Sequence, residues 1–497
     1  MAVDNDLNPV LGIDLGTTFS AIACWDGRGP QAYRIFRPDG ETLQSVVHYN
    51  PGTDEFLVGK LAYKRGLTSP ENMALGVKRL MDDASQQIEI GGRKFSPIEL
   101  SAKILEYIYK DVAGRYPPGR FKSRGTIVTV PYYFKVHQCN HTREAAKIAD
   151  INCVGILQEP IAASLSYAWQ LVQANPDRDY SENVLIFDLG GGTFDLTLFR
   201  LQQTTKQLVF EVLATGGDDR LGGMDFDQKL TQLLLDKEKL TLEGLSRKDE
   251  LKARQRLLEE AIEAKHTLSA TTSTFVGIQD IIPGKNIDID VTRAEFEALI
   301  QPYVDKIESI IENLWNTGNF KPSDVDRVIL VGGSSKIPRM KQLLNDMIGA
   351  DKVYANTNPA LCVAEGAAMY AAYLDDREVF GREIEIRTRT CHDLGVEIAN
   401  GKFHPLIRAN HKTPCEKRQI FTTESDNVTS FDINVYQGAD RLVKNNSLVG
   451  TVSISELPQR PKGELDIVVA FKVNEEQMLS VTVEVEGRRK GDGFKFT

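Results

Sequence analysis

Residues 10–25 read VLGIDLGTTFSAIACW, and residues 184–201 read VLIFDLGGGTFDLTLFRL. Each stretch consists of two apolar runs joined by a glycine-rich turn, which is the pattern of a buried β-hairpin. Asp14 and Asp188 occupy the same place in the two stretches, but they lie too far apart for the period of a repeat array. We infer that one supersecondary unit is used once in each of two large lobes.

The glycine-rich turns predict a phosphate-binding site, because backbone N–H groups without bulky side chains can approach phosphate oxygens closely. Hydroxyl groups in the same turns can donate further hydrogen bonds: Thr17, Thr18 and Thr193. A carboxylate beside a polyphosphate is repelled unless a hard cation lies between them. Asp14 and Asp188 therefore predict Mg²⁺ held through its water shell. One such turn would be a weak signal, but the two copies and a third glycine turn at 332–334 favour a phosphate site.

Helical segments follow both hairpins. Ser96 and Glu99 form a capping-box pattern with Pro97 at the first helical position. Residues 226–269 are rich in Leu, Lys, Glu and Arg and contain no Pro, so we expect a helical subdomain there. An apolar strand at 328–331 leads into the third glycine turn. Strands mixed with helices along this part of the chain predict an α/β fold.

The pattern changes after about residue 380. Residues 383–390, EIEIRTRT, alternate in polarity, and later segments such as FDINVYQG and LSVTVEVEG alternate at strand period with turn residues between them. We predict an α/β domain of two lobes over 1–380, an interdomain linker over 381–391, and a small all-β domain over 392–497. No helical pattern follows the last expected strand.

Composition and charge limit the function. The chain has 497 residues, of which 41% are hydrophobic and 26% are charged, which excludes disordered and fibrous classes. A net charge of −10 argues against nucleic acid and anionic membranes as partners. The first residues lack the features of a signal peptide, and no apolar stretch approaches the ~20 residues that span a bilayer. We expect a soluble cytoplasmic protein.

The cysteines and histidines give no metal signal. The six cysteines show no CxxC spacing, so we interpret them as reduced thiols. His137 and His141 are spaced as a zinc pair on a helix would be, but no acidic or thiol ligand joins them at metal spacing. We therefore interpret them as surface histidines.

Several motifs in the same order make the chain resemble the DnaK-type heat-shock-70 chaperones, which belong to the actin and sugar-kinase ATPase superfamily. The motifs are GIDLGTTFS at 12–20, TVPYYF at 129–134, QEPIAASLSY at 158–167, IFDLGGGTFD at 186–195, EVLATGGDDRLGGMDFD at 211–227, LVGGSSKIPRM at 330–340 and QIFTTESDN at 419–427. The resemblance covers nearly the whole chain. It implies a two-lobed actin-like ATPase domain followed by a β-sandwich domain, here without the family's helical lid.

The resemblance implies that ATP or ADP binds between the lobes with Mg²⁺, which Asp14 and Asp188 would hold. Lys78 matches the family's catalytic lysine, which positions the attacking water and stabilises charge on the γ-phosphate. Glu159 matches an acidic residue that orders metal-bound water, and Thr193 completes the catalytic set. The residues expected around the phosphates are Gly16, Thr17, Thr18, Gly190, Gly191, Gly192 and Thr193.

Adenosine is expected against residues of the third turn and of the helical subdomain: Gly332, Gly333, Ser334, Lys265 and Ser269. Three positions depart from the family pattern. Ile262 replaces a glutamate, Lys336 replaces an arginine, and Ala360 replaces an aspartate. Fewer polar groups are left to hold the adenine and ribose, which leaves nucleotide affinity and base preference open.

A peptide cleft is expected in the β domain, because the family holds an extended peptide by main-chain bonds and one apolar pocket. The matching positions are Val396, Phe421 and Ile433, with Ala399 and Glu424 at the family's arch. Phe431 replaces a smaller residue at the pocket floor. The ring either fills the volume of a substrate side chain or packs the β domain, and in the first case peptide selectivity is weak or shifted.

The coupling of the two domains is also altered. The linker EIEIRTRT is more charged than the family's leucine-rich linker, and Cys139 replaces the arginine that partners the switch proline, Pro131. Positions that usually bind J-domain co-chaperones hold Gly155, Gln158 and Ile161. A J-domain co-chaperone and a nucleotide exchange factor are possible partners that the family suggests, beside a polypeptide substrate.

We predict a heat-shock-70-like chaperone whose slow ATP hydrolysis is coupled to binding of polypeptide segments. One alternative is a nucleotide-switched binding or scaffold protein with a dedicated partner and little ATPase activity. A small-molecule kinase of the same superfamily is a second alternative, which the β domain and the pair of Lys78 and Glu159 disfavour.

Overall fold

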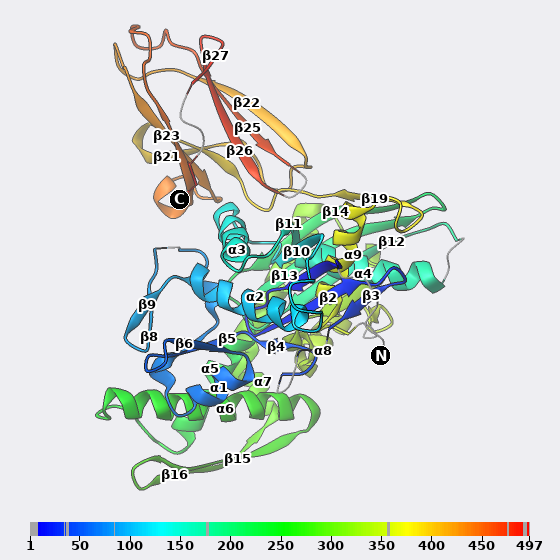
Figure 1. Cartoon of the computed structure of the whole chain (residues 1–497), viewed down its shortest axis with the longest axis vertical. Coiled ribbons are helices and arrows are strands. Elements are labelled where there is room, and N and C mark those ends of the chain that lie inside the picture. Colours follow the sequence, from blue (N-terminus) through cyan, green and yellow to red (C-terminus); the bar gives the residue numbers. More distant parts are fainter. Residues whose placement is uncertain are drawn as a thin grey trace.

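The two hairpins quoted above lie at the centres of two mixed sheets of the same design, and helices flank both sheets (Figure 1). The computed structural model describes residues 8–33, 35, 39–83, 85–174, 178–354, 358–474, 477–490 and 495–496.

The first sheet has the strand order β11-β10-β1-β2-β3, and β4 also pairs with β2. Its strands are β1 (Val10–Asp14), β2 (Phe19–Trp25), β3 (Pro30–Ala32), β4 (Leu43–Gln44), β10 (Gly125–Val130) and β11 (Cys153–Gln158). The hairpin of β1 and β2 is antiparallel, whereas β10 and β11 are added in parallel. Strands β1 and β10 are buried almost throughout, as their continuous apolar runs require.

The second sheet has the strand order β18-β17-β12-β13-β14-β19. Its strands are β12 (Tyr180–Leu189), β13 (Phe194–Gln203), β14 (Gln207–Asp218), β17 (Arg327–Val331), β18 (Val353–Tyr354) and β19 (Glu383–Arg387). The antiparallel hairpin of β12 and β13 and the parallel strands β17 and β18 repeat the arrangement of the first sheet. The predicted internal duplication is confirmed.

Two helices, α4 (Glu159–Ala174) and α9 (Cys362–Asp375), join the sheets. Their apolar side chains share one hydrophobic cluster with Ile127 of the first sheet and Ile186 of the second. Glycines permit the close approach: a Cβ on Gly12 would lie 2.1 Å from the backbone nitrogen of Ala368, which is in α9. The mixed α/β architecture expected for this part of the chain is therefore present.

The predicted helical subdomain is present and carries an additional hairpin. Helices α5 (Gly223–Lys237), α6 (Arg247–Ala270) and α7 (Arg293–Gly318) enclose one core with the hairpin of β15 (Ser273–Ile282) and β16 (Lys285–Thr292). This unit lies at the end of the molecule opposite the C-terminal sheets (Figure 1). The short helix η4 (Gly333–Lys336) and helix α8 (Pro338–Met347) follow the third glycine turn.

The first lobe carries smaller elements beside its main sheet. These are β5 (Val46–Asn50), β6 (Glu55–Val58), α1 (Lys60–Gly66), η1 (Pro70–Asn72), β7 (Met73–Leu75), η2 (Val77–Leu80), β8 (Ile88–Ile90), β9 (Arg93–Phe95), α2 (Pro97–Ala113) and α3 (Val136–Ile148). Helix α2 begins with the expected capping box: Ser96 accepts from the backbone N–H of Glu99, and the Glu99 carboxylate accepts from the N–H of Ser96.

The interpretation of two histidines as surface residues was wrong. His137 and His141 of α3 are 4% and 7% exposed, because this face of α3 packs under the residues that follow η2. His137 donates to the carboxylate of Asp82, and His141 donates from Nδ1 to the carbonyl oxygen of Met81. The helical spacing that suggested a zinc pair instead supplies two hydrogen bonds to one loop.

Two antiparallel sheets form the C-terminal part. One has the order β21-β20-β23-β24-β28 and the other β22-β25-β26-β27. Their strands are β20 (Leu394–Ile398), β21 (Lys402–Ile407), β22 (Cys415–Phe421), β23 (Phe431–Gln437), β24 (Ser447–Ile454), β25 (Ile467–Val473), β26 (Leu479–Val485), β27 (Arg488–Lys490) and β28 (Lys495–Phe496). Apolar residues from both sheets form a common hydrophobic cluster, which Val136 of α3 also joins.

The segment predicted as a linker is in part a strand. Residues Glu383–Arg387 form β19, which pairs in parallel with β14 at the edge of the second sheet. Ile384 is 6% exposed and joins the cluster between the two sheets. The alternation of EIEIRTRT thus gives one buried face, and the charged residues occupy the other.

Two remaining expectations concern thiols and membrane spans. None of the six cysteines, all of which lie in the described part of the chain, forms a disulfide, as the lack of CxxC spacing predicted. Among the described residues, no helix combines the length and the apolar character that crossing a bilayer demands.

Candidate functional site

A cavity of about 660 Å³ lies where the three glycine turns meet. The first hairpin contributes Asp14, Gly16, Thr17 and Thr18, and the second contributes Asp188, Gly190, Gly191 and Thr193. The third turn contributes Gly332, Gly333 and Ser334. Lys78, Glu159, Lys265 and Ser269 complete the set of predicted residues in the wall. The structure therefore brings together every predicted phosphate, adenosine and catalytic residue except Gly192, which does not line the cavity.

The two hairpin turns touch each other, and glycine makes this contact possible. A Cβ on Gly191 would lie 1.9 Å from the hydroxyl oxygen of Thr18, and one on Gly192 would lie 2.5 Å from the Thr17 side chain. Gly192 therefore contributes to the site indirectly, because its lack of a side chain lets the two turns pack against each other. The N–H groups of Gly223 and Met224 donate to the carbonyl oxygens of Gly190 and Gly191, which fixes the second turn to the start of α5.

The third turn approaches the second hairpin equally closely. Gly332 has φ of 76°, and a Cβ there would lie 2.4 Å from the carbonyl oxygen of Leu189 and 2.7 Å from the carboxylate of Asp188. This left-handed conformation favours glycine. The turn can therefore pass directly over the end of β12, where Asp188 lies.

Lys78 and Glu159 form a buried ion pair in the cavity. Their side chains approach to 2.5 Å, with 5% and 10% of the side-chain surface exposed. Lys78 lies in η2, and Glu159 is the first residue of α4. The Lys78 ammonium also lies 5.5 Å from the centre of the Phe134 ring. The two residues that the sequence assigned to water positioning therefore lie together on the first lobe.

The cavity concentrates negative charge. Burial and the charge of Glu159 raise the pKa of Asp14 to about 7, although Lys78 and a hydrogen bond from Thr129 oppose the shift. Burial, followed by the charges of Glu159, Asp195 and Asp14, raises the pKa of Asp188 well above its usual value. Carboxylates in this condition favour either protonation or a neighbouring cation.

The carboxylates fit a hydrated divalent cation. No group of three or more His, Cys, Asp or Glu side chains is arranged to hold a metal ion directly within the part of the chain that the structure describes. Mg²⁺ usually keeps several water ligands and takes one or two protein carboxylates together with substrate phosphates. Two carboxylates at the ends of β1 and β12 match that mode of binding.

The end of the cavity where adenosine is expected is lined by both charged and apolar residues. Lys265 forms an ion pair with Asp227 at 2.6 Å and donates to the carbonyl oxygen of Gly223. Ser269 donates to the carbonyl oxygen of Lys265. The three departures from the family pattern, Ile262, Lys336 and Ala360, all line this end together with His266.

Two residues beside the cavity, Asp195 and Arg79, have contacts that the sequence did not predict. Asp195 ends the motif IFDLGGGTFD, yet no role was assigned to it; it accepts from the backbone N–H of Tyr133. Arg79 follows Lys78 in the sequence, and no role was predicted for it. It bridges the lobes, because it donates to the carbonyl oxygen of Gly192 and to the carboxylate of Asp225. Neither role has a local signal, since both depend on residues far apart in the chain.

The residues predicted for a peptide cleft divide into two groups. Val396 and Ile433 are 2% and 7% exposed and belong to the C-terminal hydrophobic cluster. Phe421 and Phe431 pack partly buried against the same cluster. Ala399 and Glu424 are exposed, in the segments that follow β20 and β22.

The positions assigned to coupling and to co-chaperones are mostly internal. Cys139 is buried in the first lobe, and burial raises the pKa of its thiol to about 12. Gly155, Gln158 and Ile161 are also buried. A partner protein could therefore not touch these three positions directly in this arrangement.

A comparison with protein-family models finds one family that matches nearly the whole chain. The family model described as "Hsp70 protein" matches residues 10–495. The match includes both hairpins, the third glycine turn and the C-terminal sheets.

Proposed function

Because the chain belongs to the Hsp70 family, we propose that it is a heat-shock-70-like molecular chaperone that couples ATP binding and hydrolysis to binding of polypeptide segments. Family membership supports chaperone function, nucleotide binding and ATPase activity in general terms. We further propose that the residues named below carry out the reaction, that nucleotide turnover is coupled to peptide binding, and that the protein is cytoplasmic.

One observation carries the nucleotide part of the proposal. Three glycine turns from separate parts of the chain line one cavity together with two carboxylates and the buried pair of Lys78 and Glu159. A protein of net charge −10 cannot attract a polyphosphate by its overall field. Backbone N–H groups supply the attraction locally, and a cation held by Asp14 and Asp188 would add to it.

In the proposed reaction, the protein positions groups more than it forms bonds. Phosphoryl transfer to water needs an oriented nucleophile and stabilisation of charge on the transferred group. Lys78 donates toward the γ-phosphate and the attacking water, and Glu159 holds Lys78 and accepts from ordered water. Thr193 donates its hydroxyl to the phosphates. Bound Mg²⁺ would neutralise phosphate charge beside Asp14 and Asp188.

Single-turnover ATP hydrolysis tests this proposal. We expect Lys78→Ala to slow hydrolysis by about 100-fold or more while ADP binding changes little, and we expect EDTA to abolish hydrolysis. Lys94→Ala is the matched control, because Lys94 is an exposed lysine of β9 outside the cavity. Equal rates for the wild type and Lys78→Ala would remove the enzymatic proposal.

We also propose that residues 392–497 form a β-sandwich domain that binds an extended polypeptide segment, after an ATPase domain at 1–380 and a connecting segment at 381–391. The common core of the two C-terminal sheets supports the sandwich. The expected cleft residues are Val396, Ala399, Phe421, Glu424, Phe431 and Ile433. A peptide array probed in ATP and in ADP tests this part, because coupled sites give different profiles in the two nucleotides.

A nucleotide-switched binding protein with a dedicated partner is the second candidate. The observation that favours it is the loss of polar groups at Ile262 and Ala360 beside the expected adenosine site. In that case ATP closes the lobes but turns over slowly or not at all. A J-domain co-chaperone and an exchange factor belong to the first candidate, and strong stimulation of hydrolysis by a J-domain protein would favour it.

A further inference from the structure

Asp82 lies directly after the turn that carries Lys78. Lys78 is in the middle of η2, which is a single short turn, and the N–H of Met81 closes this turn on the carbonyl oxygen of Lys78 at 3.3 Å. So short a helix has few hydrogen bonds of its own. The position of Lys78 therefore depends on what holds the residues on either side.

Two basic side chains, Lys135 and Arg220, and the imidazole of His137 surround the Asp82 carboxylate. Lys135 and His137, at the start of α3, each approach it to 2.9 Å. The exposed Arg220 lies 3.6 Å away. The hydrogen bond from His137, followed by the interactions with Lys135, holds the pKa of Asp82 well below its usual range, so the carboxylate is charged at neutral pH.

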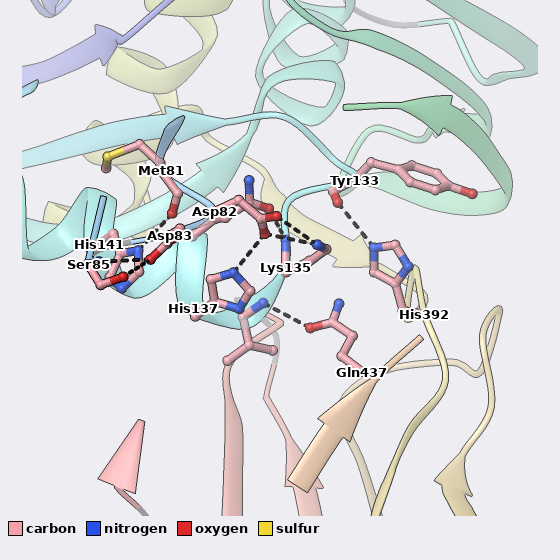
Figure 2. A network of polar contacts seen from close by, with 12 residues as sticks. Met81, Asp82, Asp83, Ser85, Tyr133, Lys135, His137, His141, His392 and Gln437 are labelled. Carbon is pink, nitrogen blue, oxygen red and sulfur yellow. Dashed lines mark hydrogen bonds and ion pairs between the residues drawn. The ribbon is translucent and has the colours of Figure 1, made fainter. Parts of the chain in front are cut away.

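Helix α3 also holds the residue before Asp82. His141 donates from Nδ1 to the carbonyl oxygen of Met81 at 2.8 Å, one helical turn beyond His137. Figure 2 shows the two imidazoles side by side beneath the loop. Residues 81 and 82 are thus held against the start of α3. His141 donates to the carbonyl oxygen of Met81, and Lys135 and His137 donate to the carboxylate of Asp82.

The start of α3 is itself held by the C-terminal sheets. The backbone N–H of Val136, the first residue of α3, donates to the side-chain oxygen of Gln437 in β23 at 3.1 Å. The Val136 side chain joins the C-terminal hydrophobic cluster. His392 donates to the carbonyl oxygen of Tyr133 in the loop before α3. Figure 2 shows this chain of contacts from Asp82 to Gln437.

We propose that Asp82 is a positioning residue for ATP hydrolysis, which fixes the Lys78 turn to α3 and thereby makes the position of Lys78 depend on the bond between Val136 and Gln437. The inference rests on the proposed ATPase function. A small displacement of Lys78 is sufficient for an effect, because misplacement by about 1 Å can cost about 100-fold in rate. Asp82 does not line the cavity, so nucleotide contacts remain when it is changed.

The test compares Asp82→Asn with a matched neighbour. Asp83 is exposed, and its side chain accepts hydrogen bonds from the backbone N–H and the hydroxyl of Ser85 (Figure 2). We expect Asp82→Asn to lower single-turnover hydrolysis by about 10- to 100-fold with less than a twofold change in ADP affinity, and Asp83→Asn to match the wild type. Hydrogen exchange over residues 77–81 should be faster in Asp82→Asn than in Asp83→Asn.

Gln437→Ala tests the link to the C-terminal sheets, and melting temperatures show that each variant folds. We expect Gln437→Ala to slow hydrolysis and the double variant with Asp82→Asn to be no slower than the slower single variant, because both act through one turn. A wild-type rate for Asp82→Asn, or equal losses in rate and ADP affinity, would overturn the positioning role. Fully additive losses would overturn the link. Failure of the proposed function is distinct, because it shows as equal rates in the wild type and Lys78→Ala.

Discussion

At the scale of single residues, the cavity holds more acidic groups than its cations balance. Burial and the excess of negative charge also raise the pKa of Asp195, a buried carboxylate that is not expected to hold the cation. Burial and the charge of Glu159 raise its pKa from 3.8 to about 7, while its hydrogen bond from the N–H of Tyr133 opposes the shift. Above pH 7 the folded, nucleotide-free protein therefore carries a buried charge that the unfolded chain would expose to water.

We expect Asp195→Asn to stabilise the nucleotide-free protein at pH 8, by about 2–4 kcal/mol, because one pKa unit corresponds to about 1.4 kcal/mol. The folded-state pKa lies above the unfolded one, so the folded state binds more protons between about pH 4 and pH 7. The cost of the charge is complete above pH 7 and is relieved as the pH falls. Urea unfolding at pH 8 and pH 5.5 measures the difference, and an equal difference at both values would contradict this account.

The Phe431 ring either fills the volume that a substrate side chain would occupy or only packs the β domain. Phe431 begins β23 and packs partly buried against the C-terminal cluster. If the ring occupies the volume of a substrate side chain, we expect Phe431→Val to strengthen binding of leucine-containing peptides by about 3- to 10-fold. Asp432→Asn is the control, because successive strand residues face opposite sides. Fluorescence anisotropy with a labelled peptide measures affinity, and unchanged affinity would mean that Phe431 only packs the domain.

The sequence predicted site residues where they belong to a motif within one continuous stretch of the chain. The glycine turns and their threonines could be read from the two hairpins, and the resemblance added Lys78 and Glu159. Asp82 could not be found in this way. Its importance comes from Lys135 and His137, which approach it from another segment, and a carboxylate beside a turn has no distinctive pattern.

At the scale of elements, the contact between α4 and α9 depends on one glycine. A Cβ on Gly366 would lie 1.7 Å from the carbonyl oxygen of Ala162. A side-chain movement cannot relieve this clash, because the carbonyl oxygen belongs to the backbone of α4 and the Cβ would be attached directly to the backbone of α9. The two helices join the sheets of the two lobes, so separating them would affect the cavity as well.

We therefore expect Gly366→Ala to destabilise the protein by about 3 kcal/mol, the upper part of the range for overpacked cores. Gly29→Ala is the matched control, since the nearest atom to its Cβ would be 3.5 Å away in the Trp169 side chain. Urea unfolding of both variants measures the effect. A Gly366→Ala midpoint equal to that of the control would show that the helices can shift at little cost.

Strand β19 lies within the segment predicted as a linker, and it pairs with β14. The family resemblance implied a linker at EIEIRTRT, although the alternating polarity of this stretch is typical of a strand. Whether Ile384 is buried depends on whether the edge of β14 is free to pair with it. Local sequence carries no information about that edge, so the strand was predictable but its docking was not.

At the scale of the whole molecule, the C-terminal sheets rest on the loop before α3. Tyr132 donates to the carbonyl oxygen of Arg389, and Cys391 donates to that of Tyr132. Figure 1 shows these sheets above α3 at one end of the molecule. The sequence predicted both parts but not their contact, because residues more than 250 positions apart meet there and each contributes an ordinary polar group.

His392 makes this contact sensitive to pH. Burial lowers the pKa of His392 below 6.5, with the charge of Lys135 acting in the same direction, while the bond to Tyr133 and the charges of Asp219 and Asp393 oppose the shift. As the pH falls through 6.5, the unfolded chain binds a proton that the folded state resists. The stability that neutral His392 permits is therefore complete above pH 6.5 and is lost on acidification.

We expect His392→Gln to lose less stability than the wild type between pH 7.5 and pH 5.5, because the glutamine amide can donate to Tyr133 without titrating. Thermal unfolding at the two pH values gives the loss for each protein, and comparing variants removes the contributions of the cavity carboxylates. His404→Gln, in β21, serves as the control and should follow the wild type. If His392→Gln also follows the wild type, the imidazole takes up its proton without disturbing the contact, and the C-terminal sheets are held by the bonds of Gln437 and Cys391 instead.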